Sequence, residues 1–256
     1  MSSELIEFSK FTKARSLQAL KISVPICIIL GFIFVNFTQL DLISSHWFYD
    51  EKLIIPAKNN SGFWLGESAF LGFIYKAVNV ISRLALFISI FTFIWFMLKK
   101  NARAFYAAIV MLSLLSGPVI AVNGVAKEQW GRARPRTIQE FNGKQQFTPA
   151  WIMTDQCKHN CSFTSGHAAA GFALCVGFFV SRRKIWLNSG LLLGGLVGLT
   201  RMMNGAHFLS DVIFSFFIVY IMSAITAYFI STLVLNYGGT RASQAREMVS
   251  IRVTRS

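Results

Sequence analysis

The 256-residue chain is poor in charged residues, proline and acids. Only 14% of its residues are charged, whereas a soluble globular domain carries about 25%. Five prolines exclude a collagen-like repeat, and a hydrophobic content of 54% excludes a disordered chain. Four cysteines in a chain of this length do not make a disulfide-rich secreted mini-protein. The composition instead indicates an integral membrane protein.

The chain contains several long apolar runs. A membrane-spanning helix needs about 20 mainly apolar residues. Six segments meet or approach this length: 22–40, 78–98, 104–125, 165–180, 185–201 and 208–235. The fourth and fifth suffice if the polar residues at their outer ends lie in the interface or line a cavity. No stretch alternates strictly between apolar and polar residues, which disfavours a β-barrel. We therefore predict an all-α polytopic membrane protein with six transmembrane helices.

The basic residues are distributed unevenly between the two sides of this topology. With the N-terminus in the cytoplasm, the cytoplasmic segments hold 14 Lys and Arg against three acids, and the other side holds nine against seven. The positive-inside rule then places both termini in the cytoplasm. The net charge of +14 has this topological explanation, so no nucleic-acid partner is expected. We predict a cytoplasmic segment 1–21, a membrane domain 22–235 and a basic cytoplasmic tail 236–256.

Segment 46–76, between the first two spans, is rich in aromatic residues. Aromatic side chains of this density suit the headgroup region of a bilayer. We predict an interfacial helix or helix pair that lies on the outer face. The alternative is a membrane-buried extension of the second span.

Three polar constellations lie at the outer face in this topology: Lys127–Pro135, Cys161–His167 and Thr200–Asp211. Ionisable groups at a membrane edge are costly and usually mark function. Lys127, Arg134 and Arg201 can converge on one site, and three cations in one place need an anion. Arg matches a tetrahedral oxyanion with a rigid fork of donors, and Lys adds a point charge.

Ser165 and Gly166 add backbone N–H groups and the positive end of a helix dipole, which suits a phosphate. His207 and Asp211 are four residues apart and share a face if the sixth helix starts early enough. The Asp can hold the imidazole in one tautomer and leave the other nitrogen free to attack. His167 can act as general acid for the leaving group. Together these residues describe phosphoryl transfer through a phosphohistidine.

Each of these residues also has an ordinary structural interpretation. Lys127 and Arg134 would be basic residues at a membrane edge, His167 an interface histidine and Asp211 a helix N-cap. The joint spacing favours the catalytic interpretation, since a structural account must place every residue independently.

The pattern K-x6-R-P, S-G-H and R-x5-H-x3-D resembles the phosphatidic acid phosphatase type 2 superfamily, which includes bacterial lipid phosphatases and vanadium-dependent haloperoxidases. The three motifs cover roughly 85 residues. The resemblance implies that His207 is the nucleophile, Asp211 its partner and His167 the acid. It implies phosphate binding by a second set: Lys127, Arg134, Ser165, Gly166 and Arg201. It also implies no metal and no cofactor.

Two positions depart from the family pattern. Thr164 stands where the family usually has Pro, and Thr200 stands where it usually has Ser. Neither change removes an atom from the expected site.

Segments 131–136, 147–151 and 160–168 are similar to the lipid A phosphatase subgroup. This implies removal of the 1- or 4′-phosphate at the periplasmic face of a bacterial inner membrane. Undecaprenyl diphosphate and phosphatidylglycerol phosphate are alternative substrates, and lipid phosphotransfer is an alternative reaction. The additional cations Arg132, Arg136 and Lys144 suit a multiply anionic headgroup. A haloperoxidase is disfavoured by the six spans, and a non-catalytic lipid binder or transporter by the complete set of catalytic residues.

Two smaller patterns concern packing and redox state. Cys157 and Cys161 lie on the outer loop, where an oxidising periplasm favours a disulfide over free thiols. His159 lies between them, so a zinc site is an alternative, but no fourth ligand is visible in the sequence. Glycines recur every four residues at Gly190, Gly194 and Gly198, and offer a small-residue face. We expect this face to pack within a monomer rather than across a dimer.

Overall fold

The computed structural model describes residues 3–55, 60–64 and 69–253 and is mainly helical. The long helices are α1 (Ser3–Asn36), α3 (Ala69–Leu98) and α9 (Leu209–Val253). A fourth long rod joins α4 (Ala104–Leu114), the π-helix η2 (Leu115–Ala126) and α5 (Lys127–Gln129). The shorter helices are α2 (Gln39–His46), α6 (Gly166–Phe172), α7 (Gly177–Val180) and α8 (Ile185–Met203). Single 3-10 turns are η3 (Pro135–Thr137), η4 (Gln139–Phe141) and η5 (Ala173–Val176).

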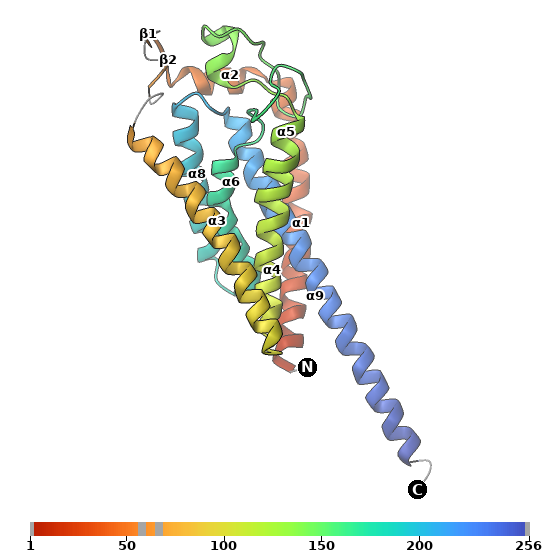
Figure 1. The fold of residues 1–256 in the computed structure, drawn as a ribbon. Coiled ribbons are helices and arrows are strands. Elements are labelled where there is room, and N and C mark those ends of the chain that lie inside the picture. Colours follow the sequence, from red (N-terminus) through yellow and green to blue (C-terminus); the bar gives the residue numbers. More distant parts are fainter. Residues whose placement is uncertain (1–2, 56–59, 65–68, 254–256) are drawn as a thin grey trace.

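The long helices form a bundle with two different ends (Figure 1). Helix α2, the strands and the long loop after α5 gather at one end, and both chain termini lie toward the other. Helix α9 packs against α1 and α4 and then extends alone beyond the bundle. The polar motifs of the sequence are therefore concentrated at the end opposite the termini.

Within the described residues, four helices are long and apolar enough to cross a membrane: Ser3–Asn36, Gly72–Leu98, Ala104–Gln129 and Leu209–Tyr237. They contain most of the predicted spans 22–40, 78–98, 104–125 and 208–235. A shorter apolar run, Gly166–Val180, occupies the predicted fourth span, and α8 the fifth. Helix α1 already begins at Ser3 and α9 continues to Val253, so the predicted boundaries at 21 and 235 do not coincide with helix ends.

The prediction of an interfacial helix over 46–76 is wrong for the middle of that segment. Strands β1 (Tyr49–Ile55) and β2 (Asn60–Phe63) pair there as an antiparallel hairpin. The alternative, a helical extension of the second span, holds only from Ala69. Gly62 has φ +83°, a value that a regular helix does not accommodate. Phe63 is completely buried in a cluster with Phe141 and Phe208. Burial of the Phe63 ring against distant residues stabilises the paired strands. The number of aromatic residues in a segment does not by itself distinguish such strands from an interfacial helix.

Small residues bring α1 and α9 together. The buried face of α1 repeats every three or four residues: Ser9, Thr12, Ser16, Ala19 and Ser23. The buried residues of α9 include an equally small set: Ser223, Ala224, Ala227 and Ser231. Lipid supplies no hydrophobic drive for helices to associate, so close backbone packing of this kind is the expected source of stability.

The π-helix η2 follows from two residues at its start. Gly117 and Pro118 interrupt the regular helix, and Pro118 has no N–H to donate to the preceding turn. The Asn123 amide donates to the Pro118 carbonyl at 2.7 Å. The helix continues through this irregularity and ends just after Lys127, which it delivers to the loop end of the bundle.

The glycine face of α8 packs within the chain, as expected. A Cβ at Gly190 would overlap Cys175, one at Gly194 would overlap Phe172, and one at Gly198 would overlap Val212. Helix α8 therefore lies directly on the α6–η5 segment and on the start of α9. This close contact positions Arg201, in the last turn of α8.

Replacing Gly194 with Ala should separate α8 from α6. The added methyl meets the Phe172 ring, and overpacking of this kind lowers the free energy of unfolding by about 1–3 kcal/mol. Gly195→Ala is the matched control, because no described atom lies within 4 Å of its added Cβ. Chemical unfolding in detergent measures both variants, and equal stability of the two would contradict the packing described.

Candidate active site

His207 lies in the short connection between α8 and α9 and is completely buried. Its Nδ1 is 2.7 Å from the Ser162 carbonyl oxygen and 3.6 Å from Asp211 Oδ2. A carbonyl oxygen only accepts, so Nδ1 carries the hydrogen and donates it. The other ring nitrogen, Nε2, is buried and has no hydrogen-bond partner among the described residues.

Asp211 acts on His207 mainly through Ser162. One carboxylate oxygen of Asp211 accepts the Ser162 hydroxyl at 2.5 Å and the Phe208 amide at 2.8 Å. His207 and Asp211 would share a helix face only if the last helix started before His207, and this condition is not met because α9 begins at Leu209. Asp211 joins the start of α9 to the Ser162 side chain, and the Ser162 carbonyl orients the imidazole.

Arg132 forms buried ion pairs with Asp41 and Asp211. Its guanidinium contacts Asp211 Oδ1 at 2.6 Å and Asp41 Oδ2 at 2.7 Å, and all three side chains are 0% exposed. Burial by itself would lower the pKa of Arg132, but the charges of Asp211 and Asp41 outweigh it and the pKa is raised. Asp41 also accepts the amide of Ser210 at 2.9 Å. The expectation that Arg132 faces the headgroup is therefore wrong.

Sequence reasoning missed Asp41 and Ser162 as parts of the site. The signal for Asp41 is that it directly follows the first predicted span in a chain with only 11 acids. A carboxylate at a membrane edge needs a cation. No local spacing, however, connects Asp41 with Arg132, which lies 91 residues further along the chain.

The three expected phosphate-binding cations lie close to one another. The charges of Arg134 and Arg201 act on Lys127, and all three act on His167. Burial, then Arg136 and Arg201, lowers the pKa of Arg134 to about 10. Lys127, Arg134 and Arg201 form no ion pair within the described part of the chain, and Arg201 Nε is buried without a partner. Unpaired like charges held together in this way suit the binding of an anion.

The second motif starts helix α6. Ser165 is its N-cap, with the hydroxyl accepting the Ala168 amide at 3.4 Å, and the Ser165 amide donates to the Asp211 carbonyl at 3.3 Å. That amide is thus already occupied. A Cβ on Gly166 would overlap the Asn123 side chain, so packing against η2 also requires glycine here. His167 Nε2 lies 3.3 Å from the amide of Asn79 on α3.

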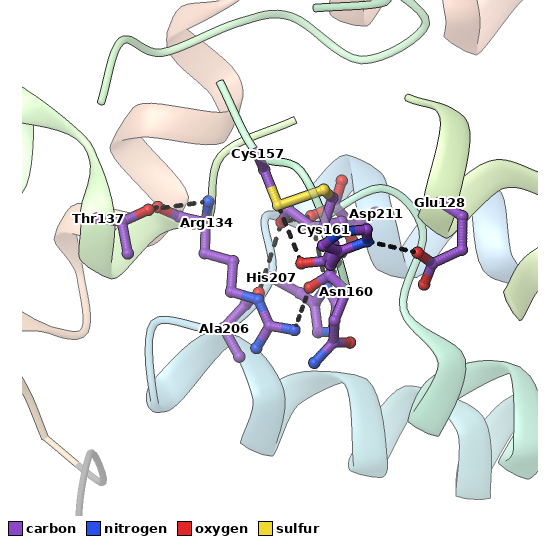
Figure 2. The surroundings of a disulfide bond; sticks show 11 residues. Glu128, Arg134, Thr137, Cys157, Asn160, Cys161, Ala206, His207 and Asp211 are labelled. Carbon is purple, nitrogen blue, oxygen red and sulfur yellow. Dashed lines mark hydrogen bonds and ion pairs between the residues drawn. A yellow bond between two sulfur atoms is a disulfide. The ribbon is translucent and has the colours of Figure 1, made fainter. Parts of the chain in front are cut away.

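The structure joins Cys157 and Cys161 in a disulfide beside Arg134 (Figure 2). Within the loop that it closes, the Asn160 carbonyl accepts Arg134 Nη2 at 2.6 Å. His159 Nδ1 lies 3.8 Å from Glu128. The disulfide loop therefore fixes one side of the Arg134 guanidinium. Lys144, the outermost of the additional cations, is exposed.

The electrostatic surroundings keep His207 neutral. Burial lowers the pKa of His207 to about 3, and the charges of Arg201 and Arg134 also lower it, whereas Asp211 raises it. A neutral imidazole with its Nε2 lone pair free is a competent nucleophile. The adjacent cations attract a substrate that carries negative charge. The arrangement can therefore perform group transfer from an anionic centre such as a phosphoryl group.

The fold and the site define a helical membrane protein with a cluster of cations close to a buried histidine. The chain belongs to the PAP2 superfamily, which it matches over residues 105–235, a range that contains all three motifs. It is thus a lipid phosphatase of a metal-independent phosphomonoesterase family.

Three similar proteins carry the same name, lipid A 4′-phosphatase. The protein of Francisella tularensis subsp. novicida (strain U112) is 31% identical over 213 residues, which are 78% of this chain and 90% of the relative. That of Rhizobium leguminosarum is 40% identical over 43% of this chain and 49% of its own length. That of Rhizobium etli is 42% identical over 39% and 40%. No solved structure matches the chain.

The lowered pKa of His207 predicts that its imidazole stays neutral in mildly acid solution. An unperturbed histidine gains its proton near pH 6.5, whereas His207 should remain neutral down to about pH 4, because burial disfavours the cation. NMR of the protein with 15N-labelled histidine measures this, with His207→Gln assigning the signal. A His207 titration midpoint between 6 and 7 would contradict the electrostatics described.

Arg132→Gln should strongly destabilise the loop end of the bundle. It leaves the carboxylates of Asp41 and Asp211 buried without a counter-charge, which costs about 3–5 kcal/mol. Lys144→Gln, on an exposed cation of the same loop, should change stability by less than about 0.5 kcal/mol. The free energy of unfolding in detergent decides between these expectations, and equal small losses would argue against the ionic bridge.

Proposed function

We propose that this protein removes the 4′-phosphate from lipid A. The observation that carries the proposal is the 31% identity, over 78% of the chain, to a protein named lipid A 4′-phosphatase. The geometry supports the chemistry, because a buried neutral imidazole lies beside cations without acidic partners among the described residues. Those cations suit the phosphate of an anionic lipid headgroup.

The first chemical step makes a phosphohistidine. His207 Nε2 attacks the phosphorus atom, the bond from phosphorus to the sugar oxygen breaks, and His167 gives its proton to that oxygen. Lys127, Arg134 and Arg201 neutralise the charge of the phosphate oxygens, and the Ser165 hydroxyl and the Gly166 amide add hydrogen bonds. The Asp211 carboxylate accepts the Ser162 hydroxyl, and the Ser162 carbonyl keeps the imidazole oriented during the attack.

The second step releases inorganic phosphate. A water molecule attacks the phosphohistidine, the bond between phosphorus and nitrogen breaks, and His167 takes the proton of the water. His207 returns to its neutral form and His167 to its protonated form, so the cycle closes. No metal or cofactor takes part in these steps, since the three cations supply the charge neutralisation.

The topology we propose has six spans, both termini in the cytoplasm and the site at the periplasmic face of a bacterial inner membrane. Segment 166–180 and helix α8 are the two short spans. Their outer ends carry His167 and Arg201, and these polar residues face the cation cluster of the site instead of lipid. The exposed Trp47 and Trp64 at the same end suit the headgroup region. The protein acts as a monomer, since the glycine face of α8 is already covered within the chain.

Detergent-purified protein incubated with bis-phosphorylated lipid A tests the proposal. We expect the wild type to release one phosphate, and mass spectrometric fragments of the product to place the loss at the 4′-position. His207→Gln should lower the rate at least about 10³-fold, because the nucleophile is absent. His46→Gln is the matched control, because His46 is exposed on α2 and should retain full activity.

Three outcomes count against parts of the proposal. Full activity in His207→Gln would overturn the mechanism. Loss of the 1-phosphate would overturn the proposed position. Turnover of undecaprenyl diphosphate or phosphatidylglycerol phosphate without turnover of lipid A would replace the substrate and keep the phosphatase.

A further inference from the structure

Helix α3 is exposed along most of its length yet carries polar residues at the site. Among residues 72–98 of this helix only Ser89 is buried in the chain, so most of the helix surface faces the surroundings of the bundle. Asn79 and Tyr75 lie four residues apart, on one face of the helix. A polar amide on a membrane helix is costly unless it has a partner, and such a residue usually marks function.

Both side chains contact residues of the second and third motifs. The amide nitrogen of Asn79 is 3.3 Å from His167 Nε2. The Tyr75 ring lies 5.4 Å from the His167 ring, and the Arg201 guanidinium lies 4.2 Å above the Tyr75 ring. The Tyr75 hydroxyl donates to the Thr200 carbonyl at 3.3 Å. Helix α3 is thus held against the second and third motifs at once, although it lies outside the matched range 105–235.

We propose that α3 supplies a fourth part of the active site, in which Asn79 is a positioning residue for His167. The inference rests on the proposed function, because it concerns the proton that His167 delivers to the leaving lipid oxygen. Tyr75 keeps α3 at the site through its contacts with Arg201 and Thr200.

The contact with Asn79 determines which nitrogen of His167 handles the proton. Rotation of the side-chain amide can turn either its NH2 group or its oxygen toward His167, and with the oxygen turned inward Asn79 accepts Nε2–H in both the charged and the neutral state of the imidazole. With the amide oxygen accepting Nε2–H, Nδ1 is the nitrogen that gives its proton to the leaving oxygen. The same nitrogen takes a proton from water in the second step, and the hydrogen bond to Asn79 persists throughout.

Leaving-group dependence tests this role. Asn79→Leu keeps the size of the side chain and removes its hydrogen bond. We expect kcat/KM on the lipid phosphate to fall about 10- to 100-fold, a part of what general acid catalysis supplies. On p-nitrophenyl phosphate, whose phenolate leaves without a proton, we expect a change below about threefold. Asn79→Asp, which keeps an acceptor for Nε2–H, should recover most of the lost rate.

Ser82→Ala is the control on the same helix, because its hydroxyl bonds only to its own backbone at Val78 and Asn79. It should match the wild type on both substrates. Equal losses in Asn79→Leu on both substrates, or no loss on either, would overturn the proposal.

NMR of 15N-labelled histidine adds a readout that needs no turnover. The wild type should show His167 with hydrogen on Nε2, and Asn79→Leu should lose that single tautomer. An unchanged His167 signal in the variant overturns the proposal whatever the substrate is. If the wild type and His207→Gln are equally inactive on both substrates, the proposed function fails while the NMR result still decides the role of Asn79.

Discussion

The buried bridge of Arg132 with Asp41 and Asp211 is the interaction on which the loop end of this protein depends. It joins α2, the loop after α5 and the first turn of α9, which are far apart in the sequence. Taking three charges out of water is expensive, and only close pairing with further hydrogen bonds offsets that cost. Here the Thr148 carbonyl and the Ser210 hydroxyl also accept from the guanidinium. The reactive histidine is held by the same structure, because Asp211 fixes Ser162 and Ser162 orients His207.

Arg132 and Arg134 are two residues apart and have opposite electrostatic roles. Arg132 is neutralised by two carboxylates, whereas Arg134 lies among Arg136, Arg201 and Lys127. Asp41 and Asp211 are thus committed to Arg132. The outer cations are left with excess positive charge in a partly dry environment. Under the proposed function, a bound phosphate would remove this repulsion.

Small residues let the helices carry these groups to one place. The serine and alanine faces of α1 and α9 allow close backbone approach, and the glycines of α8 place Arg201 beside α6 and α9. By contrast, α3 is largely exposed and contacts the site through Tyr75 and Asn79.

The sequence by itself determined the membrane class, the long helices and the motif residues, because composition, apolar run length and motif spacing are local properties. Residues Lys127, Arg134, His167 and Arg201 were found in this way, and the charges of the three cations all act on His167 in the structure. Tertiary structure alone decided that residues 49–55 and 60–63 pair as antiparallel strands, since the burial of Phe63 depends on distant rings. It also decided that Arg132 forms an ion pair with Asp41 and that Asn79 contacts His167. Those pairs join residues 91 and 88 positions apart, and no periodicity in a single chain records such a contact.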